Sequence, residues 1–183
     1  MDTFDPEDKR LETIITEYVS TSTGETLNRD NPGKRFIQGA IPLKYAEDPA
    51  QIGEGSQIDW IVFRYADALT LLAEAIVRNE KAVTQEAVDL LNQVRTRSLP
   101  GKGYSIVDFA DVKAFLDAVL LERGHELWFE GTRREDLIRH GVYIEYMKKY
   151  KDSKTAAPHM VLWPLPQDVI NEGGGLVHQN PGY

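Results

Sequence analysis

The sequence predicts a mostly α-helical fold, a portion of a tetratricopeptide-like (TPR-like) α–α superhelix, with long loops and short β segments on its N-terminal side. Two observations carry this prediction. From Trp60 onward, apolar residues recur at steps of three and four, the pattern of an amphipathic helix. Residues 1–58, in contrast, mix polar residues with turn signals. A chain of 183 residues with 42% hydrophobic residues can bury a core, so we expect 1–183 to form a single domain.

Loops and short strands are expected over residues 1–58. Turn signals stand at 30–33 (Asp-Asn-Pro-Gly) and at 53–56 (Gly-Glu-Gly-Ser). Between them and before them, apolar and polar residues alternate only over the short stretches 11–19 and 36–45. Alternation of this kind indicates strands of a few residues each.

A helical hairpin is expected over residues 60–100. Thr84 is a suitable N-cap for the second helix, which Pro100 and Gly101 end. Ala73 and Ala87 fall on packing positions of the TPR template, where closely packed antiparallel helices interlock. Any α–α hairpin would share most of these positions through amphipathicity alone. The apolar stripes are Ala66, Leu69, Leu72, Ala73 and Ile76 in the first helix, and Ala87, Leu90, Leu91 and Val94 in the second.

Further helices are expected over residues 105–150, followed by an extended tail over 151–183. The third long helix begins near Ser105, Asp108 or Asp111, each of which could cap it, and Gly131 is its natural stop. Shorter helical segments follow at 136–139 and 142–149. The residues at 163–166 are expected to be extended, because each proline disfavours helix in the residue before it.

Composition and missing motifs narrow the function classes. The 21 basic and 29 acidic residues give a net charge of -8, so phosphate backbones repel the chain and nucleic acid is not an expected partner. Cysteine is absent, which excludes thiol nucleophiles and lipid attachment to a Cys within this sequence. No nucleotide-binding or nucleophile motif is present and the four histidines lack metal-ligand spacing, so we expect no cofactor, no metal and no enzyme.

The sequence carries no membrane-targeting signal of its own. No stretch reaches the roughly 18 apolar residues of a membrane span, and the N-terminus lacks the features of a signal peptide. If the protein is exported, we expect its signal and any anchor to lie outside this sequence.

Glu122, Glu126 and Glu130 recur every four residues, so on one continuous helix their side chains would share a face, with neighbours roughly 6 Å apart. One hypothesis is a pair of glycosidase carboxylates, whose spacing of roughly 5–10 Å sets the stereochemistry of hydrolysis. The favoured interpretation is a set of ion pairs, because planar guanidinium groups bind carboxylates with paired hydrogen bonds. The predicted structural network comprises Arg64, Arg95, Glu122, Arg123, Glu126, Glu130, Arg133 and Asp136.

Aromatic rings are candidates for sugar contact, because the apolar C–H face of a sugar stacks on a flat ring. Tyr45, Trp60 and Tyr143 are the candidate glycan-binding residues. Tyr143 also belongs to a helical series with Tyr146 and Tyr150, a spacing that more often indicates packing. The ligand-contact residues therefore stay open.

The motifs resemble those of the SusD/RagB family, in the same order along the chain. The segment at 122–137 (ERGHELWFEGTRREDL) is similar to the family's ERRxELxFEGxRxxDL stretch, although Gly124 replaces its second Arg and Arg134-Glu135 replace an aromatic pair. The other matching segments are 5–11 (DPEDKRL), 63–75 (FRYADALTLLAEA), 91–97 (LNQVRTR), 162–167 (LWPLPQ) and 179–183 (QNPGY).

The resemblance implies a cell-surface lipoprotein of the outer membrane that takes part in nutrient uptake and polysaccharide utilisation. Such a protein binds a glycan or other nutrient and delivers it to a SusC-like TonB-dependent barrel, without catalysis. Membrane contact is implied only through a lipid anchor that this sequence lacks. The alternative is a TPR-like scaffold that holds a protein partner and binds no glycan.

Overall fold

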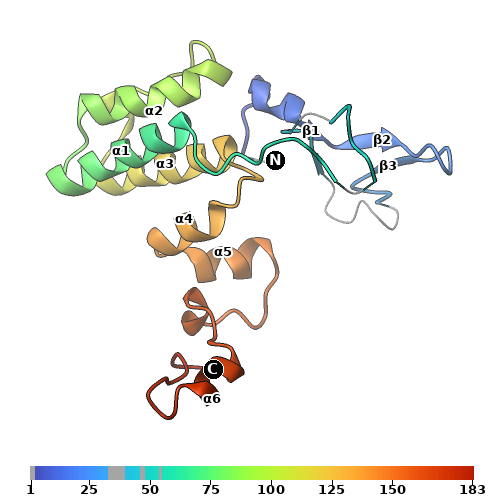
Figure 1. The fold of residues 1–183 in the computed structure, drawn as a ribbon. Coiled ribbons are helices and arrows are strands. Elements are labelled where there is room, and N and C mark those ends of the chain that lie inside the picture. The colour runs from blue at the N-terminus through green and yellow to red at the C-terminus, as the bar shows by residue number, and fades with distance from the viewer. Residues whose placement is uncertain (1–2, 33–39, 46–47, 54) are drawn as a thin grey trace. The chain divides into compact units, whose positions relative to one another are not determined.

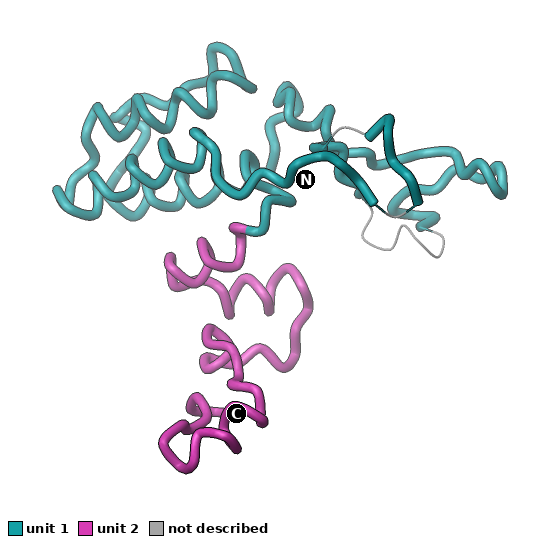
Figure 2. Tube along the Cα trace, in the orientation of Figure 1, with its two compact units in different colours: residues 1–131 teal, residues 132–183 magenta. Residues whose placement is uncertain are grey.

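The computed structural model describes residues 3–32, 40–45, 48–53 and 55–183 (Figure 1). Contacts between Cα atoms group the chain into two compact units, residues 1–131 and 132–183 (Figure 2). Helices dominate both units, which confirms the mostly α fold class. Whether the chain forms a single domain stays a prediction. In the described residues, no helix is both long and apolar enough to cross a bilayer.

Short strands lie on the N-terminal side of the first unit. β1 (Ile14–Ile15) pairs with β4 (Ile41–Pro42), and β2 (Glu17–Val19) pairs with β3 (Thr26–Asn28), both antiparallel. A short 3-10 helix, η1 (Lys9–Thr13), precedes them. The short β segments expected here are confirmed for the described residues, while 36–39 of the predicted alternation lie outside them.

The predicted hairpin consists of α1 (Tyr65–Glu80) and α2 (Gln85–Ser98). The Thr84 side chain accepts a hydrogen bond from the Ala87 N–H at 3.2 Å, so the predicted N-cap is present. α1 begins five residues later than Trp60, because the chain is still extended at its N-cap, Arg64. The TPR-like register of the hairpin stays a prediction.

The third long helix, α3, spans Val112–Glu126. Its N-cap is Asp111, whose carboxylate accepts from the Ala114 N–H at 2.8 Å, whereas Ser105 caps the separate 3-10 helix η2 (Ile106–Asp108). The prediction that the helix continues to Gly131 is wrong. It ends at Glu126, where the Leu127 N–H closes the last turn on the Arg123 carbonyl at 2.8 Å, and the chain then turns.

The core of the first unit lies between α1, α2 and α3. Small residues meet here: Ala73 of α1 and Ala87 of α2 are completely buried, so the two helix backbones approach closely. Burying several large side chains around them supplies the main driving force for folding this unit. The fully buried members are Ala73, Val77, Ala87, Val88, Leu91, Phe115 and Val119.

The second unit contains α4 (Arg133–Arg139), α5 (Tyr143–Tyr150), the 3-10 helix η3 (Pro158–Val161) and α6 (Gln167–Glu172). The extended tail predicted for 151–183 is therefore interrupted by two short helices. α6 follows directly on Pro166, whose fixed φ of −55° suits the entry to a helix. Residues 163–166 themselves are not helical, as predicted.

Two side-chain amides near the C-terminus bind the proline-containing segment of the second unit. The Gln179 side chain accepts from the Leu165 N–H at 2.8 Å and donates to the Leu165 carbonyl at 2.9 Å. Asn180 donates to the Trp163 carbonyl at 2.7 Å. Pro164 and Pro166 have no N–H for regular backbone pairing, so these amides take the place of a neighbouring strand.

Candidate functional site

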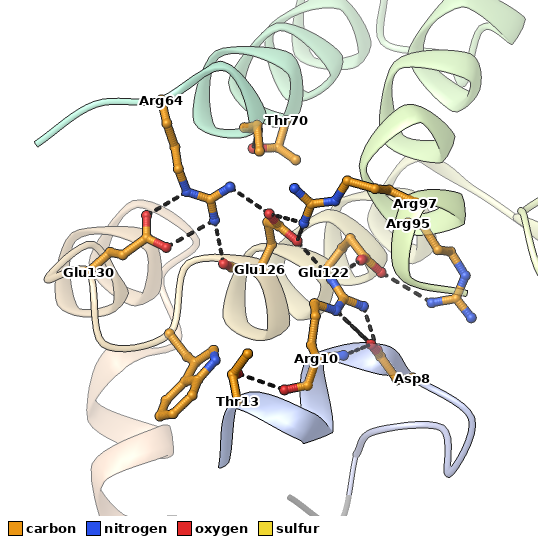
Figure 3. Close-up of polar contacts among 12 residues, drawn as sticks. Asp8, Arg10, Thr13, Arg64, Thr70, Arg95, Arg97, Glu122, Glu126 and Glu130 are labelled. Atoms are coloured by element: carbon orange, nitrogen blue, oxygen red, sulfur yellow. Dashed lines mark hydrogen bonds and ion pairs between the residues drawn. The ribbon is translucent and has the colours of Figure 1, made fainter. Parts of the chain in front are cut away.

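A buried ion-pair cluster lies where α3 meets α1, α2 and the N-terminal segment (Figure 3). Three glutamates at and beyond the end of α3 form its centre, and basic side chains from four other segments surround them. The acid–arginine cluster, as we name it, comprises Asp8, Arg10, Lys44, Arg64, Arg95, Arg97, Glu122, Glu126 and Glu130.

Glu126 is the most heavily bonded acid of this cluster. Its side chain is only 1% exposed and accepts from Arg64 at 2.5 Å, from Arg97 at 2.5 and 2.7 Å, and from Arg10 at 3.2 Å. Figure 3 shows the carboxylate between these guanidinium groups. Such bonds offset the cost of burying a charge, which is large for an isolated carboxylate.

Arg10 joins the N-terminal segment to α3. It donates to Glu122 at 2.5 Å and to both oxygens of Asp8 at 2.6–3.1 Å, while Arg95 reaches the other oxygen of Glu122 at 3.1 Å. Burial opposes the charge of Arg10, but its hydrogen bonds to Asp8 and the attraction of Glu122 raise its pKa overall. The fully buried carboxylate of Glu122 is thus held by two arginines.

Glu130 lies four residues beyond the end of α3, so the prediction that it extends the helical stripe is corrected. It nevertheless reaches the cluster, because Arg64 donates to it at 2.7 and 2.9 Å and Lys44 forms an ion pair with it. Burial raises the pKa of Glu130, but the hydrogen bonds from Arg64 and Lys44 lower it by more, so the net shift is downward. Burial lowers the pKa of Lys44, against the opposing effect of Glu130.

The remaining members of the predicted network lie elsewhere. Arg123 pairs with Asp67 of α1 at 2.7 Å and donates to the Thr70 hydroxyl at 2.7 Å. Arg133 and Asp136 belong to the second unit. There, the Arg133 guanidinium lies 5.2 Å from the centre of the Tyr146 ring, and Asp136 pairs with Arg139 at 2.7 Å.

Sequence reasoning missed three members of the cluster, namely Asp8, Arg10 and Lys44, and it left Arg97 out of the predicted network although this arginine is one of those expected to pair with the glutamates. A signal existed for Asp8 and Arg10, because both lie in the segment at 5–11 that matches a family motif. Lys44 has no such signal: it follows β4 and donates to the Trp128 carbonyl at 3.2 Å, a contact between residues 84 positions apart.

The buried side chain of His125, which lies close to the cluster, should make the stability of the fold depend on pH. Its ring is 5% exposed, stacks on Phe4 with centroids 3.9 Å apart and bonds the Thr3 hydroxyl through Nε2 at 2.9 Å. Burial, and then the charge of Arg10, lower the pKa of His125 from 6.5 to about 4. Below pH 6.5 the unfolded chain therefore takes up a proton that the folded chain does not, and stability falls as pH falls.

We expect the free energy of unfolding to drop by about 2 kcal/mol from this histidine between pH 7 and pH 5. Urea denaturation at both pH values measures it. His125→Phe keeps the ring stack and should remove this part of the pH dependence, whereas His178→Gln, a change at an exposed position, should leave it intact. An unchanged pH dependence in His125→Phe would contradict the expected shift.

Two of the candidate aromatic residues lie together in the first unit. The rings of Tyr45 and Trp60 stack with centroids 4.6 Å apart and planes 15° apart, and Phe129 meets Trp60 edge-on at 5.9 Å. Trp60 is 54% exposed and Phe129 53%. The third candidate, Tyr143, belongs to the second unit, where the Arg134 guanidinium lies 5.3 Å from the centre of its ring.

A cavity of about 250 Å³ lies beside the acid–arginine cluster, and of the three rings described above only that of Tyr45 lines it. Acidic and basic groups line it together, and each acid in its lining is bonded to a basic side chain. Over the described ranges, no group of three His, Asp or Glu side chains is placed to hold a metal ion. The cavity is lined by Arg10, Thr13, Lys44, Tyr45, Ile61, Arg64, Arg97, His125, Glu126, Trp128 and Glu130.

Comparison with known proteins gives consistent matches. The sequence model of the SusD family matches residues 1–183. A SusD-like protein of Formosa agariphila is 37% identical over 110 residues, which are 57% of this chain and 21% of that protein. A crystal structure of a SusD homologue from Bacteroides thetaiotaomicron is 25% identical with a TM-score of 0.74, over 97% of this chain and 41% of that one.

A further solved structure has the same fold. Surface glycan-binding protein A from Bacteroides thetaiotaomicron superposes with a TM-score of 0.70 at 21% identity, over 98% of this chain and 39% of that chain. The chain thus spans about a fifth of the Formosa relative and about two fifths of the solved structures.

Proposed function

The chain belongs to the SusD family, and we propose that it serves in the non-catalytic capture of glycans or other nutrients at the cell surface. The observation that carries the proposal is the family match, which extends over residues 1–183. The captured ligand would pass to a SusC-like TonB-dependent barrel in the outer membrane. The chain would contribute a TPR-like hairpin to a lipoprotein that is held at the membrane by a lipid anchor outside this sequence.

The burial and hydrogen bonding of Glu122 and Glu126 support a role without catalysis. A glycosidase needs one carboxyl group free to donate a proton and a second free to attack or to activate water. Glu122 and Glu126 are instead bonded to arginines on both of their oxygens and are almost completely buried. Release of new reducing ends from a polysaccharide by the purified chain would contradict this part of the proposal.

Binding to soluble polysaccharides tests the proposed capture. We expect the purified chain to be retarded in native gels that contain at least one of laminarin, xylan, galactomannan, alginate or polygalacturonate, relative to a gel without polysaccharide. Bovine serum albumin in the same gels controls for retardation by viscosity. A folded chain that migrates normally in every gel would contradict glycan binding by this chain.

The second candidate function is a scaffold that holds a protein partner. Exposed large apolar side chains just before and along α1 favour it, since Phe63 is 83% exposed, Tyr65 73% and Leu72 48%. Affinity purification from outer membranes separates the two candidates. A barrel protein recovered together with glycan binding supports capture and delivery, whereas recovery of a protein partner by a chain that binds no glycan supports the scaffold.

A further inference from the structure

The solvent-exposed face of α1 is apolar over most of its length, unlike those of the other two long helices. From Tyr65 to Ala75 every exposed position is apolar, and these positions, which we name the α1 stripe, are Tyr65, Ala68, Leu71, Leu72 and Ala75. The exposed positions of the other two helices are all polar, namely Gln85, Glu86, Asp89, Gln93 and Arg97 in α2, and Lys113 and Asp117 in α3. Apolar side chains along several turns are unfavourable in water, so the α1 stripe is a candidate binding face.

The α1 stripe has the spacing of a seam between two paired helices. Tyr65, Ala68, Leu72 and Ala75 follow one another at steps of three, four and three, so they share one face of the helix. Residues at the seam of paired helices recur with this alternation. Large and small side chains also alternate along the stripe, and each small residue leaves space for a large one from a neighbouring helix.

The order of large and small side chains fits a second copy of the same stripe. When two copies of α1 run antiparallel about a twofold axis midway between positions 68 and 72, Tyr65 of one copy lies opposite Ala75 of the other. Ala68 then lies opposite Leu72, so each large side chain meets a small one on both sides of the axis. Two parallel copies in register would instead place large against large and small against small.

The charges beside the α1 stripe fit the same antiparallel pairing. Gln93 and Arg97 of α2 line a groove of about 330 Å³ together with Tyr65, so this edge of α2 lies next to the stripe. The edge is acidic near the start of α2, at Glu86 and Asp89, and basic near its end, where the Arg97 side chain is 58% exposed. A twofold axis brings the basic end of one copy toward the acidic end of the other, so opposite charges meet at the rim of the contact.

We propose that the α1 stripe is the interface of a homodimer, in which two copies of this chain pair antiparallel along α1 and the adjoining edge of α2. Stable dimers bury roughly 1,200–2,000 Å². Because this contact runs along one helix and its edge, we expect a dissociation constant in the micromolar and not the nanomolar range. The inference goes beyond glycan capture and does not depend on it: a monomeric chain that binds polysaccharide would remove the dimer and leave glycan capture standing.

The molecular mass in solution tests the dimer. Size-exclusion chromatography with multi-angle light scattering, from micromolar to sub-millimolar protein, should give a mass that rises toward twice the 20.7 kDa of one chain. The buffer needs physiological salt, because each copy has a net charge of -8 and salt screens the repulsion beyond about 8 Å. A chain that stays monomeric over the whole range would overturn the proposal and leave this face to a helix of another protein.

Leu72→Glu places a charge near the centre of the proposed interface. We expect it to weaken dimerisation at least about tenfold, because its carboxylate would be buried against Ala68 of the other copy without a partner. Leu72 is 48% exposed in the single chain, so the fold should survive, which far-ultraviolet circular dichroism checks. Leu176→Glu is the matched control, since it makes the same replacement at a position of the second unit that is 89% exposed. Dimerisation that survives Leu72→Glu, or that is lost equally in Leu176→Glu, would contradict the assignment to α1.

Disulfide crosslinking tests the antiparallel direction independently, and the chain suits it because it has no cysteine of its own. A mixture of Tyr65→Cys and Ala75→Cys should form a linked dimer under mild oxidation, since these positions lie opposite each other. Either variant alone should not, because position 65 of one antiparallel copy lies about 15 Å along the helix axis from position 65 of the other. Self-linkage of Tyr65→Cys would identify parallel pairing, and a mixture that does not link would overturn the proposed register.

Discussion

Glu126→Gln lowers the free energy of unfolding by about 3–5 kcal/mol, the loss expected when one partner of a buried ion-pair network is removed. The change keeps the shape of the side chain but removes its charge, so Arg10, Arg64 and Arg97 lose the negative charge that they share, and one of the two acceptor oxygens is lost. The new amide also directs an N–H group toward guanidinium donors. Arg97 contributes less than the others to this loss, because its side chain is 58% exposed and water can replace the bond.

Glu80→Gln is the matched control for this effect. Glu80 is exposed and stands at the C-terminal end of α1, where a negative charge is unfavourable to the helix, so the same replacement should be neutral or slightly stabilising. Urea denaturation followed by far-ultraviolet circular dichroism measures both variants. Equal midpoints for Glu126→Gln and the parent chain would show that the acid–arginine cluster does not hold the fold.

Local signals account for the parts of the fold that could be predicted from the sequence. The hairpin of α1 and α2 follows from apolar spacing and from the Thr84 cap, both of which act within one or two turns. The end of α3 could not be predicted in this way. Glycine at position 131 suggests a stop and does have a positive φ, but the helix closes five residues earlier, and Phe129, which is not a glycine, has a positive φ as well.

The candidate site depends on contacts between distant parts of the chain, which spacing alone does not reveal. Glutamates every four residues suggested ion pairs with arginines, and Glu122 and Glu126 do lie among guanidinium groups. Arg10 reaches Glu122 across 112 positions, and no periodic pattern connects the two. The stacking of Tyr45 on Trp60 is likewise a contact between residues outside regular elements, which local sequence patterns do not reveal.

Phe115→Ala lowers the free energy of unfolding by about 3–5 kcal/mol, the range found when a phenyl side chain is deleted from a packed core. Phe115 is completely buried between the three long helices, and its ring meets that of Phe109 edge-on with centroids 5.0 Å apart. Deleting it removes both the transfer free energy of the ring and the contacts of its neighbours. The small residues Ala73 and Ala87 cannot fill the space, because the helix backbones already approach closely there.

Phe63→Ala separates burial from the chemical change itself. Phe63 loses the same atoms but is 83% exposed, so in this chain the replacement should change stability by less than about 0.5 kcal/mol. Comparable losses in Phe63→Ala and Phe115→Ala would mean that the face of α1 near Phe63 is as important to folding as the three-helix core. A large loss for Phe115 alone makes this core the element that holds α3, and with it the glutamates of the cluster, in place.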